Sequence, residues 1–407
     1  CSSSPFVVAS PTTTKLTMAS KPSRRQKRVV HLLDYGAGNV RSVRNALTLL
    51  GCEIVDVSTA EEVDRATVLI FPGVGSFGHA VERLKSMKVW EALKRYLGDP
   101  SRPFLGICIG MQVLFESSSE CPGIEGLGVF AGAVDKFDGS KLKVPVPHIG
   151  WNEVRPTSSL GEGHRFYFVH SFRVAASPFA SGTATYGGET FVAAVQRENQ
   201  CAVQFHPEKS ADQGLALLDR FLETTTTTPV PKNGLPLLGA AADEEQQHEA
   251  PRGPPPPKGG LAKRIVCALD VRENDAGDLV VTKGDSYDVR EKTEGRAVRN
   301  LGKPVHLAER YYREGCDEIA ILNICAFKGE PIADLPLLSV LREASTKVFV
   351  PITIGGGVRG YERADGIKVD ALQVASAYFR AGADKVSIGS DAVYAAQRWL
   401  QQKNHDD

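Results

Sequence analysis

The chain has 407 residues, of which 42% are apolar and 24% charged, a composition typical of a globular protein with two or three domains. Lys plus Arg and Asp plus Glu both number 48, and this balance argues against a nucleic-acid-binding protein. No apolar run approaches the roughly 18 residues that a membrane-spanning helix needs. The eight cysteines show neither paired nor metal-type spacing, which favours a reducing compartment and predicts no metal site.

The first 28 residues differ from the rest of the chain, because they contain six Lys or Arg, many Ser and Thr, and no Asp or Glu. A leader of this composition resembles an organelle transit peptide. We therefore expect residues 1–28 to be a leader and the protein to lie in the plastid (chloroplast stroma). The alternative is a cytoplasmic protein with a disordered basic tail. The chain begins with Cys1, and we expect this start to be incomplete.

A glycine-rich segment containing Gly73, Val74 and Gly75 follows a predicted strand at residues 67–70. A turn of this kind can aim several backbone N–H groups at one point. We expect these three residues to stabilise an oxyanion that develops during a reaction.

A second junction surrounds Cys108. Residues 106–110 read Gly-Ile-Cys-Ile-Gly, between an apolar strand at 103–105 and a predicted helix that starts at 111–115. This is the pattern of a nucleophile elbow, whose turn is too tight for side chains on either flank. Cys108 would lie at the N-terminus of the helix, where the dipole and free N–H groups favour a thiolate. Most cysteines are buried and inert, so the pattern needs support from other segments.

His206 and Glu208 follow a predicted apolar strand that ends before Pro207. A base that takes the thiol proton, and an acid that orients this base, would complete a catalytic triad with Cys108. The alternative readings are a hydrogen-bonded loop histidine and a solvated carboxylate.

Together these three segments resemble the class I glutamine amidotransferases, with Cys108, His206 and Glu208 as the triad. The resemblance implies an α/β fold with an open, mostly parallel sheet over residues 29–223. The segments 34–39, 147–154 and 167–172 resemble, more narrowly, the glutaminase part of the imidazole glycerol phosphate synthase family. This match implies that Gln112 contacts the glutamine substrate, and that Asn39 and residues 147–152 face the synthase partner.

Residues 224–260 form a predicted linker, because five threonines, an acidic cluster and four consecutive prolines cannot build a packed core. Polyproline geometry would stiffen this segment locally. A functional low-complexity binding motif is the alternative.

Residues 261–407 alternate between predicted strands, at 264–271, 317–323, 348–354 and 385–388, and predicted helices, at 305–312, 337–344 and 370–381. This order predicts the first half of a (β/α)8 TIM-type barrel, whose strands are buried on both faces. Polar groups at the carboxyl ends of barrel strands carry the chemistry of such enzymes. Asp270 is therefore a candidate general acid/base, and the alternative is a rim carboxylate in a salt bridge. The remaining candidates at this end are phosphate contacts, for which a plain turn at the consecutive glycines is the alternative, namely Gly356, Gly357, Gly389 and Ser390.

The segments 263–270, 281–284, 352–357 and 383–387 resemble the cyclase part of the same synthase family. The match implies that Asp270 is a catalytic acid/base and that Lys283 lies on a mobile loop near the substrate. It also implies that Asp384 contacts the glutaminase domain. Three further residues match a charged gate at the bottom of the barrel, namely Arg264, Glu318 and Lys385.

Two departures from the family pattern concern the second domain. Asn323 replaces an aspartate that many bacterial relatives carry, and the family's second catalytic aspartate has no counterpart before Asp407. A half barrel has two unpaired sheet edges and an open core. We therefore expect this chain to be a piece of a longer protein, with a cyclase that is inactive in this form.

The resulting prediction is a bifunctional enzyme of histidine biosynthesis. Glutamine hydrolysis would release ammonia into the barrel, where the ribulosyl aminoimidazole carboxamide ribonucleotide (PRFAR) becomes imidazole glycerol phosphate and AICAR. The two domains would meet in an intramolecular interface, in a monomer without cofactor. The alternatives are a glutaminase that serves another acceptor, such as an anthranilate- or pyridoxal-phosphate-type synthase, and a non-catalytic scaffold.

Overall fold

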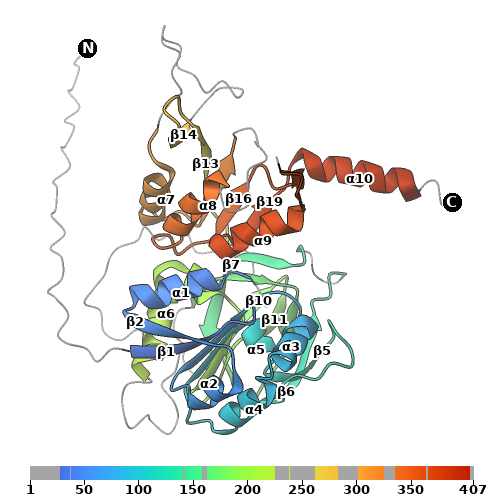
Figure 1. The fold of residues 1–407 in the computed structure, drawn as a ribbon. Coiled ribbons are helices and arrows are strands. Elements are labelled where there is room, and N and C mark those ends of the chain that lie inside the picture. The colour runs from blue at the N-terminus through green and yellow to red at the C-terminus, as the bar shows by residue number, and fades with distance from the viewer. Residues whose placement is uncertain are drawn as a thin grey trace, which may run out of the picture.

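The computed structural model describes residues 28–36, 38–140, 142, 144–157, 163–224, 238, 262–282, 301–324, 335–363 and 365–403 (Figure 1). Nearly all of the predicted leader and linker therefore lie outside the described residues. Arg28 and Thr224, at the edges of these two predicted segments, belong to β1 (Arg28–Leu33) and α6 (Ala211–Thr224). The domain boundaries as such stay predictions.

The first domain is built on an open sheet whose parallel part has the order β2-β1-β3-β4-β12. Its other strands here are β2 (Cys52–Val57), β3 (Leu69–Gly73), β4 (Phe104–Cys108) and β12 (Gln200–Val203). The central strands β3, β4 and β12 are buried on both faces, and neighbouring residues such as Leu69 and Ile70 contribute to separate core clusters. The predicted class of α/β fold is thus confirmed for this domain.

Helices cover both faces of this parallel sheet. α1 (Val40–Leu49) and α6 pack on one face, where their apolar residues share a core with alternate strand residues. α2 (Ala60–Arg65), α3 (Phe77–Ser86) and α4 (Trp90–Gly98) pack on the other face. The apolar side chains of each helix recur at helical spacing, so burying one stripe of each helix closes the core.

An antiparallel region extends the sheet beyond β12 through β11 (Glu189–Arg197), β10 (Ala180–Tyr186), β7 (His148–Pro156) and β8 (His164–His170). Three further strands lie off this path, namely β5 (Phe115–Ser118), β6 (Phe130–Lys136) and β9 (Phe172–Val174). The predicted helix at 111–115 is therefore wrong in its second half. Phe115 starts β5 and pairs with Phe130, because its fully buried ring packs against that ring at a centroid distance of 5.7 Å.

The second domain contains a five-stranded sheet of order β14-β13-β15-β16-β19, parallel except for β14. Its strands are β13 (Val266–Glu273), β14 (Leu279–Thr282), β15 (Glu318–Asn323), β16 (Ile352–Gly355) and β19 (Lys385–Ser387). The helices are α7 (Pro304–Arg313), α8 (Pro336–Ala344), α9 (Ala371–Ala381) and α10 (Ser390–Lys403). A separate pair of short strands is formed by β17 (Tyr361–Glu362) and β18 (Lys368–Val369). The alternation of strands and helices agrees with the predicted βα units. The sequence did not predict β14.

Only one face of this second sheet is covered within the described part of the chain. Leu269 and Val271 share a core with α7, α8 and α9, whereas Val266 is 44% exposed. The expectation that β13 is buried on both faces is therefore wrong, because α7, α8 and α9 all pack against the same side of the sheet. Asp270 points to the exposed side and is not at the strand end, since β13 continues to Glu273 and pairs with β14.

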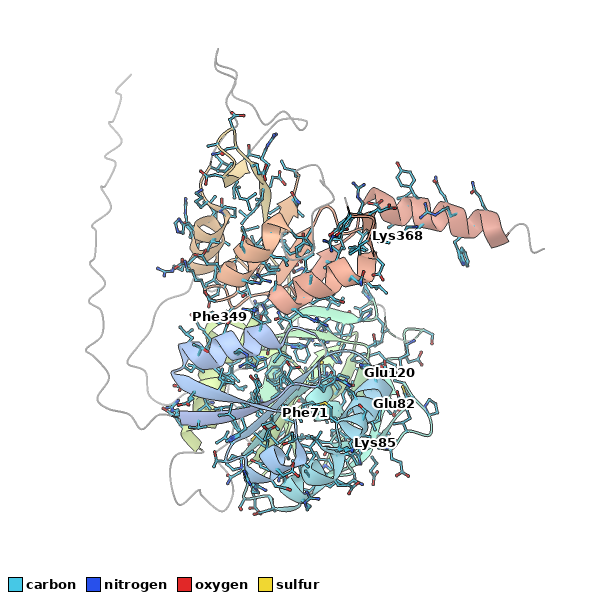
Figure 2. All side chains as sticks on the ribbon, in the orientation of Figure 1. Phe71, Glu82, Lys85, Glu120, Phe349 and Lys368 are labelled. Atoms are coloured by element: carbon cyan, nitrogen blue, oxygen red, sulfur yellow. The ribbon has the colours of Figure 1, made fainter. Side chains whose placement is uncertain are left out.

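The two domains contact each other through interlocking apolar side chains. Phe349 of the second domain packs into the core of the first, and Figure 2 labels it at the boundary between them. Trp151 and Tyr167 of the first domain pack into the core of the second. The Trp151 indole Nε1 also donates a hydrogen bond to the carbonyl of Asp317 at 3.1 Å. This packing holds β7 and β8 directly against the second sheet.

Candidate active site

Cys108 is the last residue of β4 and has an unusual backbone, with φ 55° and ψ −105°. A Cβ at Gly110 would lie 1.9 Å from the carbonyl oxygen of Phe71, and one at Gly106 would lie 2.5 Å from the carbonyl oxygen of Gly110. Only glycine fits at these two positions. The clash at Gly106 lies within the turn, as expected from the sequence, whereas the clash at Gly110 is with the neighbouring strand β3. The positive φ of Cys108 strains its backbone by about 1–3 kcal/mol, and such strain is typical of a nucleophile held in a tight turn.

The helix that follows Cys108 is shorter than the sequence predicts. α5 (Ile109–Gln112) has four residues, a single turn. Because a helix dipole grows from the alignment of many peptide units, one turn provides little of the expected field. Stabilisation of a thiolate at Cys108 therefore needs donors from elsewhere in the fold.

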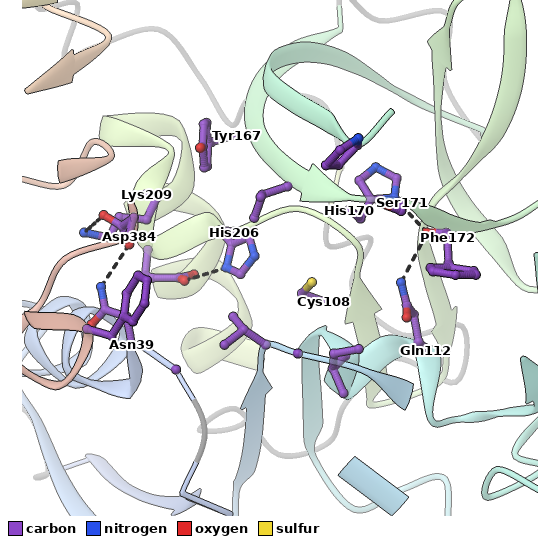
Figure 3. A pocket seen from close by; sticks show the side chains of 18 of the residues that line it. Asn39, Cys108, Gln112, Tyr167, His170, Ser171, Phe172, His206, Lys209 and Asp384 are labelled. Carbon is purple, nitrogen blue, oxygen red and sulfur yellow. Dashed lines mark hydrogen bonds and ion pairs between the residues drawn. The ribbon is translucent and has the colours of Figure 1, made fainter. Parts of the chain in front are cut away.

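His206 and Glu208 form a buried pair beside Cys108 (Figure 3). The Nδ1 of His206 lies 2.8 Å from the Oε1 of Glu208, and the two side chains are only 8% and 5% exposed. Burial opposes protonation of the ring, but the negative charges of Glu208 and Cys108 outweigh it and hold the pKa of His206 well above its ordinary value. Its Nε2 is buried without a hydrogen-bond partner among the described residues, so it can exchange a proton within the pocket.

The backbone around His206 is fixed by neighbouring residues. Its N–H donates to the carbonyl of Tyr167 at 2.9 Å, and its carbonyl accepts a hydrogen bond from the Ser210 hydroxyl at 2.6 Å. Pro207 to Lys209 form a single 3-10 turn, η1 (Pro207–Lys209), that brings Glu208 back to the imidazole. The buried position of Glu208 contradicts the alternative of a solvated carboxylate, whereas the hydrogen bonds of His206 also agree with the alternative of a hydrogen-bonded loop histidine.

The glycine-rich turn lies next to Cys108, because β3 pairs with β4 in the register Gly73 to Cys108. The Tyr35 hydroxyl donates to the carbonyl of Val74 at 2.6 Å and thereby orients the following peptide. Gly75 has φ +108°, a conformation that favours glycine. This arrangement is compatible with the predicted oxyanion role of the turn, which stays a prediction.

A cavity of about 530 Å³ lies at the boundary between the two domains, and it is lined by Cys108, His206, Glu208, Val74 and Gly75. Its walls include Gln112, Glu120 and the segment from Tyr167 to Phe172 of the first domain, and Phe379, Ala383 and Asp384 of the second. The sequence did not single out Glu120, whose Oε2 accepts a hydrogen bond from the N–H of Phe77 at 2.8 Å. A carboxylate on this wall can bind an ammonium group of a ligand.

A hydrogen-bonded pair of histidines lies at the cavity, where His170 is part of the wall. His148 and His170 contact through Nδ1 and Nε2 at 3.0 Å, and the Nδ1 of His170 lies 2.8 Å from the carbonyl of Phe172. Burial, together with the neighbouring His170, lowers the pKa of His148 to about 2. Burial also lowers the pKa of His170 to about 4. Both rings are therefore neutral near pH 7 and serve as hydrogen-bonding links.

Asp384 connects the two domains at the edge of the cavity. Its Oδ2 lies 2.8 Å from the Nζ of Lys209, and its Oδ1 accepts a hydrogen bond from the Nδ2 of Asn39 at 2.9 Å (Figure 3). Asn39 was predicted from the sequence to face the second domain and Asp384 to face the first, and the structure brings them together. Lys209 was not predicted to take part, although it is a buried charge in the segment that contains His206.

The three residues of the predicted gate also lie together. Glu318 is buried, its Oε1 contacts the Nζ of Lys385, and its Oε2 lies 3.7 Å from the Nε of Arg264. Glu318 and Lys385 start their strands, so this charged group lies at the amino end of the parallel sheet. The Nζ of Lys385 is 6.0 Å from the ring of Tyr167, which also lines the cavity.

The candidates at the opposite end of the second sheet are less closely grouped. Gly356 has φ +84°, and a Cβ there would lie 2.0 Å from the carbonyl oxygen of Asn323, so this glycine is required by the backbone. Gly357 also has positive φ, while Gly389 precedes the first residue of α10, Ser390. Asp270 is exposed on β13, and Lys283 lies outside the described residues. The phosphate contacts stay predictions.

The described residues contain neither a metal-binding group nor a membrane-spanning helix. No group of three or more His, Cys, Asp or Glu there has the geometry to hold a metal ion. No helix in this part of the chain is long and apolar enough to cross a membrane.

Comparisons with known proteins agree with the two-domain arrangement. The glutamine amidotransferase class-I family matches residues 31–224, and the histidine biosynthesis protein family matches residues 264–403. The imidazole glycerol phosphate synthase hisHF, chloroplastic, of Arabidopsis thaliana is 47% identical over 395 residues, with 95% of this chain and 62% of the relative covered. The chain thus spans less than two thirds of that relative's length.

One further relative matches nearly the whole chain and another matches about half of it. The imidazole glycerol phosphate synthase hisHF of Schizosaccharomyces pombe is 46% identical, with 92% of this chain and 68% of the relative covered. The imidazole glycerol phosphate synthase subunit HisH of Trichodesmium erythraeum is 40% identical, with 50% of this chain and 96% of the relative covered. With an elbow cysteine and a His–Glu pair at a cavity between two such domains, the chain belongs to the imidazole glycerol phosphate synthase hisHF family.

Proposed function

We propose that the first domain hydrolyses glutamine and delivers ammonia to the second domain for the synthesis of imidazole glycerol phosphate. The observation that carries this proposal is the convergence of Cys108 and the His206–Glu208 pair in a cavity that residues of both domains line. A glutaminase that served a separate acceptor protein would not need its cavity closed by its own chain. The names of the relatives support the same assignment.

The chemistry begins with attack by the Cys108 thiolate on the carboxamide carbon of glutamine. The carbonyl oxygen becomes an oxyanion, which backbone N–H groups of the turn at Gly73, Val74 and Gly75 would stabilise. Protonated His206 gives its proton to the departing nitrogen, and ammonia leaves a thioester on the sulfur. Neutral His206 then takes a proton from water, the resulting hydroxide adds to the thioester, and collapse releases glutamate and restores the Cys108 thiolate beside protonated His206.

The negative charge of Glu208 favours the proton transfers that this mechanism assigns to His206. It favours the protonated imidazole, so His206 is ready to act as an acid when ammonia departs. At the far wall of the cavity, Glu120 offers a carboxylate to the α-ammonium group of glutamine, and Gln112 provides a further polar contact.

Ammonia would leave the cavity on the side of the second domain. Tyr167 lies both on the cavity wall and near Lys385, so the charged group of Glu318, Arg264 and Lys385 lies next to the route into the sheet. Transfer within the protein keeps ammonia unprotonated and nucleophilic. Beyond the gate it would meet PRFAR, with Asp270 as acid/base, Lys283 near the substrate, and Gly356, Gly357, Gly389 and Ser390 as phosphate contacts.

We further propose a plastid location and a monomer without cofactor. A basic, acid-poor leader at residues 1–28 and a relative named as chloroplastic support the location. In this proposal a linker at residues 224–260 joins a domain at 29–223 to a domain at 261–407, so the interface between the domains is intramolecular.

The test measures glutamate release by the protein with PRFAR, and with chorismate or a pyridoxal-phosphate precursor as alternative acceptors. We expect PRFAR alone to stimulate glutamine hydrolysis. An electrophilic glutamine analogue should label Cys108, and Cys108→Ala should abolish glutamate release. Stimulation by another acceptor would favour a different synthase. Unchanged glutamate release in Cys108→Ala would show that the nucleophile is assigned wrongly, and wild-type protein without any glutaminase activity would favour a scaffold.

A further inference from the structure

Gln204 is a fully buried polar side chain between two residues of the candidate active site. Its Nε2 lies 3.6 Å from the Sγ of Cys108, and its Oε1 accepts a hydrogen bond from the Nε2 of Gln112 at 2.9 Å. Its exposure is 0%, and its backbone N–H donates to the carbonyl of Ala193 at 2.9 Å. The side chain therefore has one position, held from both ends.

The direction of these hydrogen bonds follows from a single backbone carbonyl. The oxygen of Phe172 can only accept, so the amide atom of Gln112 that lies 3.2 Å from it must be the donor, Nε2. The same Nε2 donates its second hydrogen to Gln204. The atom of Gln204 that faces Gln112 must then be the oxygen, which leaves the N–H₂ group of Gln204 to face the sulfur.

The carbonyl of Phe172 is fixed in turn by the histidine pair. It lies 2.8 Å from the Nδ1 of His170, which must donate to it, so the Nε2 of His170 is unprotonated and accepts a hydrogen bond from the Nδ1 of His148. The donor and the acceptor of each hydrogen bond are therefore assigned at every step from His148 on β7 to the sulfur of Cys108.

The sulfur needs such a donor. A thiolate is a better hydrogen-bond acceptor than a thiol, so an N–H directed at the sulfur favours the nucleophilic form. The one-turn helix α5 provides little of the dipole that usually supports a thiolate at an elbow.

We propose that Gln204 is a positioning residue of the glutaminase site, which donates an N–H to the sulfur of Cys108 and fixes the orientation of the Gln112 amide. Because both hydrogens of the Gln112 Nε2 are used within the protein, only its Oε1 can meet a ligand. The site would therefore select a hydrogen-bond donor of the substrate at this point, such as an ammonium or carboxamide N–H group. This inference rests on the proposed glutaminase function.

Two substitutions separate the two roles. Gln204→Met keeps the length of the side chain and removes both amide functions. Gln204→Glu keeps an acceptor for Gln112 but replaces the donor to the sulfur with a group whose ionised form repels a thiolate. Gln200→Met is the matched control, because Gln200 is also a buried amide on β12 but donates to the carbonyls of Leu97 and Asp99, away from the cavity.

The first readout is the pH dependence of Cys108 alkylation by iodoacetamide, followed by mass spectrometry of the peptide that contains it. We expect the midpoint of this profile to rise by about one pH unit in Gln204→Met, as for the loss of one hydrogen bond to a charged group. It should rise further in Gln204→Glu and stay unchanged in Gln200→Met. This measurement needs no glutamine turnover, so it tests the contact with the sulfur even if the proposed function fails.

The second readout is the KM for glutamine. It should rise by roughly two- to tenfold in Gln204→Met, which releases Gln112, and stay close to the wild-type value in Gln204→Glu. Circular dichroism spectra must match the wild type for both variants. Unchanged alkylation midpoints in both would overturn the role at the sulfur. An equal rise of KM in both variants would overturn the role in orienting Gln112.

Discussion

Glu208→Gln tests the origin of the raised His206 pKa most directly. The substitution keeps the size of the side chain and an oxygen that can accept from Nδ1, but removes a charge 2.8 Å from the ring. Both side chains are less than a tenth exposed, so water screens their attraction only weakly. At an effective dielectric of about 20, opposite charges at this distance attract by about 6 kcal/mol.

The effect on stability depends on pH in a defined direction. Because the pKa of His206 in the folded protein is above 6.5, the stabilisation from the charged pair is complete below about pH 6.5 and disappears as pH rises through the folded value. Loss of one partner of a buried ion pair costs about 3–5 kcal/mol. We therefore expect Glu208→Gln to lower the free energy of unfolding by about this amount at pH 6, and by less at alkaline pH.

The measurement is urea unfolding of wild type and variant at several pH values between 6 and 10. Only the difference between the two proteins is informative, because His148 and His170 add their own pH dependence. The pKa values of these rings are lowered in the folded protein, so they reduce stability as pH falls below about 6.5 in both proteins alike. A difference that is constant across this range, or that grows with pH, would refute the assigned cause of the His206 shift.

Two other substitutions have expected results. Gly110→Ala would place a Cβ 1.9 Å from the carbonyl oxygen of Phe71, so it should lower the free energy of unfolding, measured in urea, by about 2–4 kcal/mol. The control is Gly98→Ala, whose Cβ would have nothing within 4 Å and which should change this free energy by less than about 1 kcal/mol. Equal effects would mean that the elbow tolerates a side chain. Asp384→Asn removes the countercharge of the buried Lys209 and should cost about 3–5 kcal/mol in the same assay, and a loss of less than about 1 kcal/mol would show that this ion pair does not hold the domains together.

The sequence alone predicted those parts of the site that depend on local geometry. Gly106 is required by the turn around Cys108 itself, and His206 and Glu208 are close enough in the chain for one 3-10 turn to bring them together. The four parallel strands of the second domain and the three helices α7, α8 and α9 were also predicted in the correct order, because their apolar residues recur with regular spacing. Regular spacing does not reveal the length of a one-turn helix or which face of β13 is covered.

Only the tertiary structure decided those contacts between distant residues that no sequence motif marks as a pair. Gln204 meets Cys108 across 96 positions, and Asn39 meets Asp384 across 345. Neither pair has a local pattern, since each depends on which strands become neighbours and on how the two domains pack. A buried amide or carboxylate takes its role from the partners that surround it after folding, and those partners are set by long-range packing.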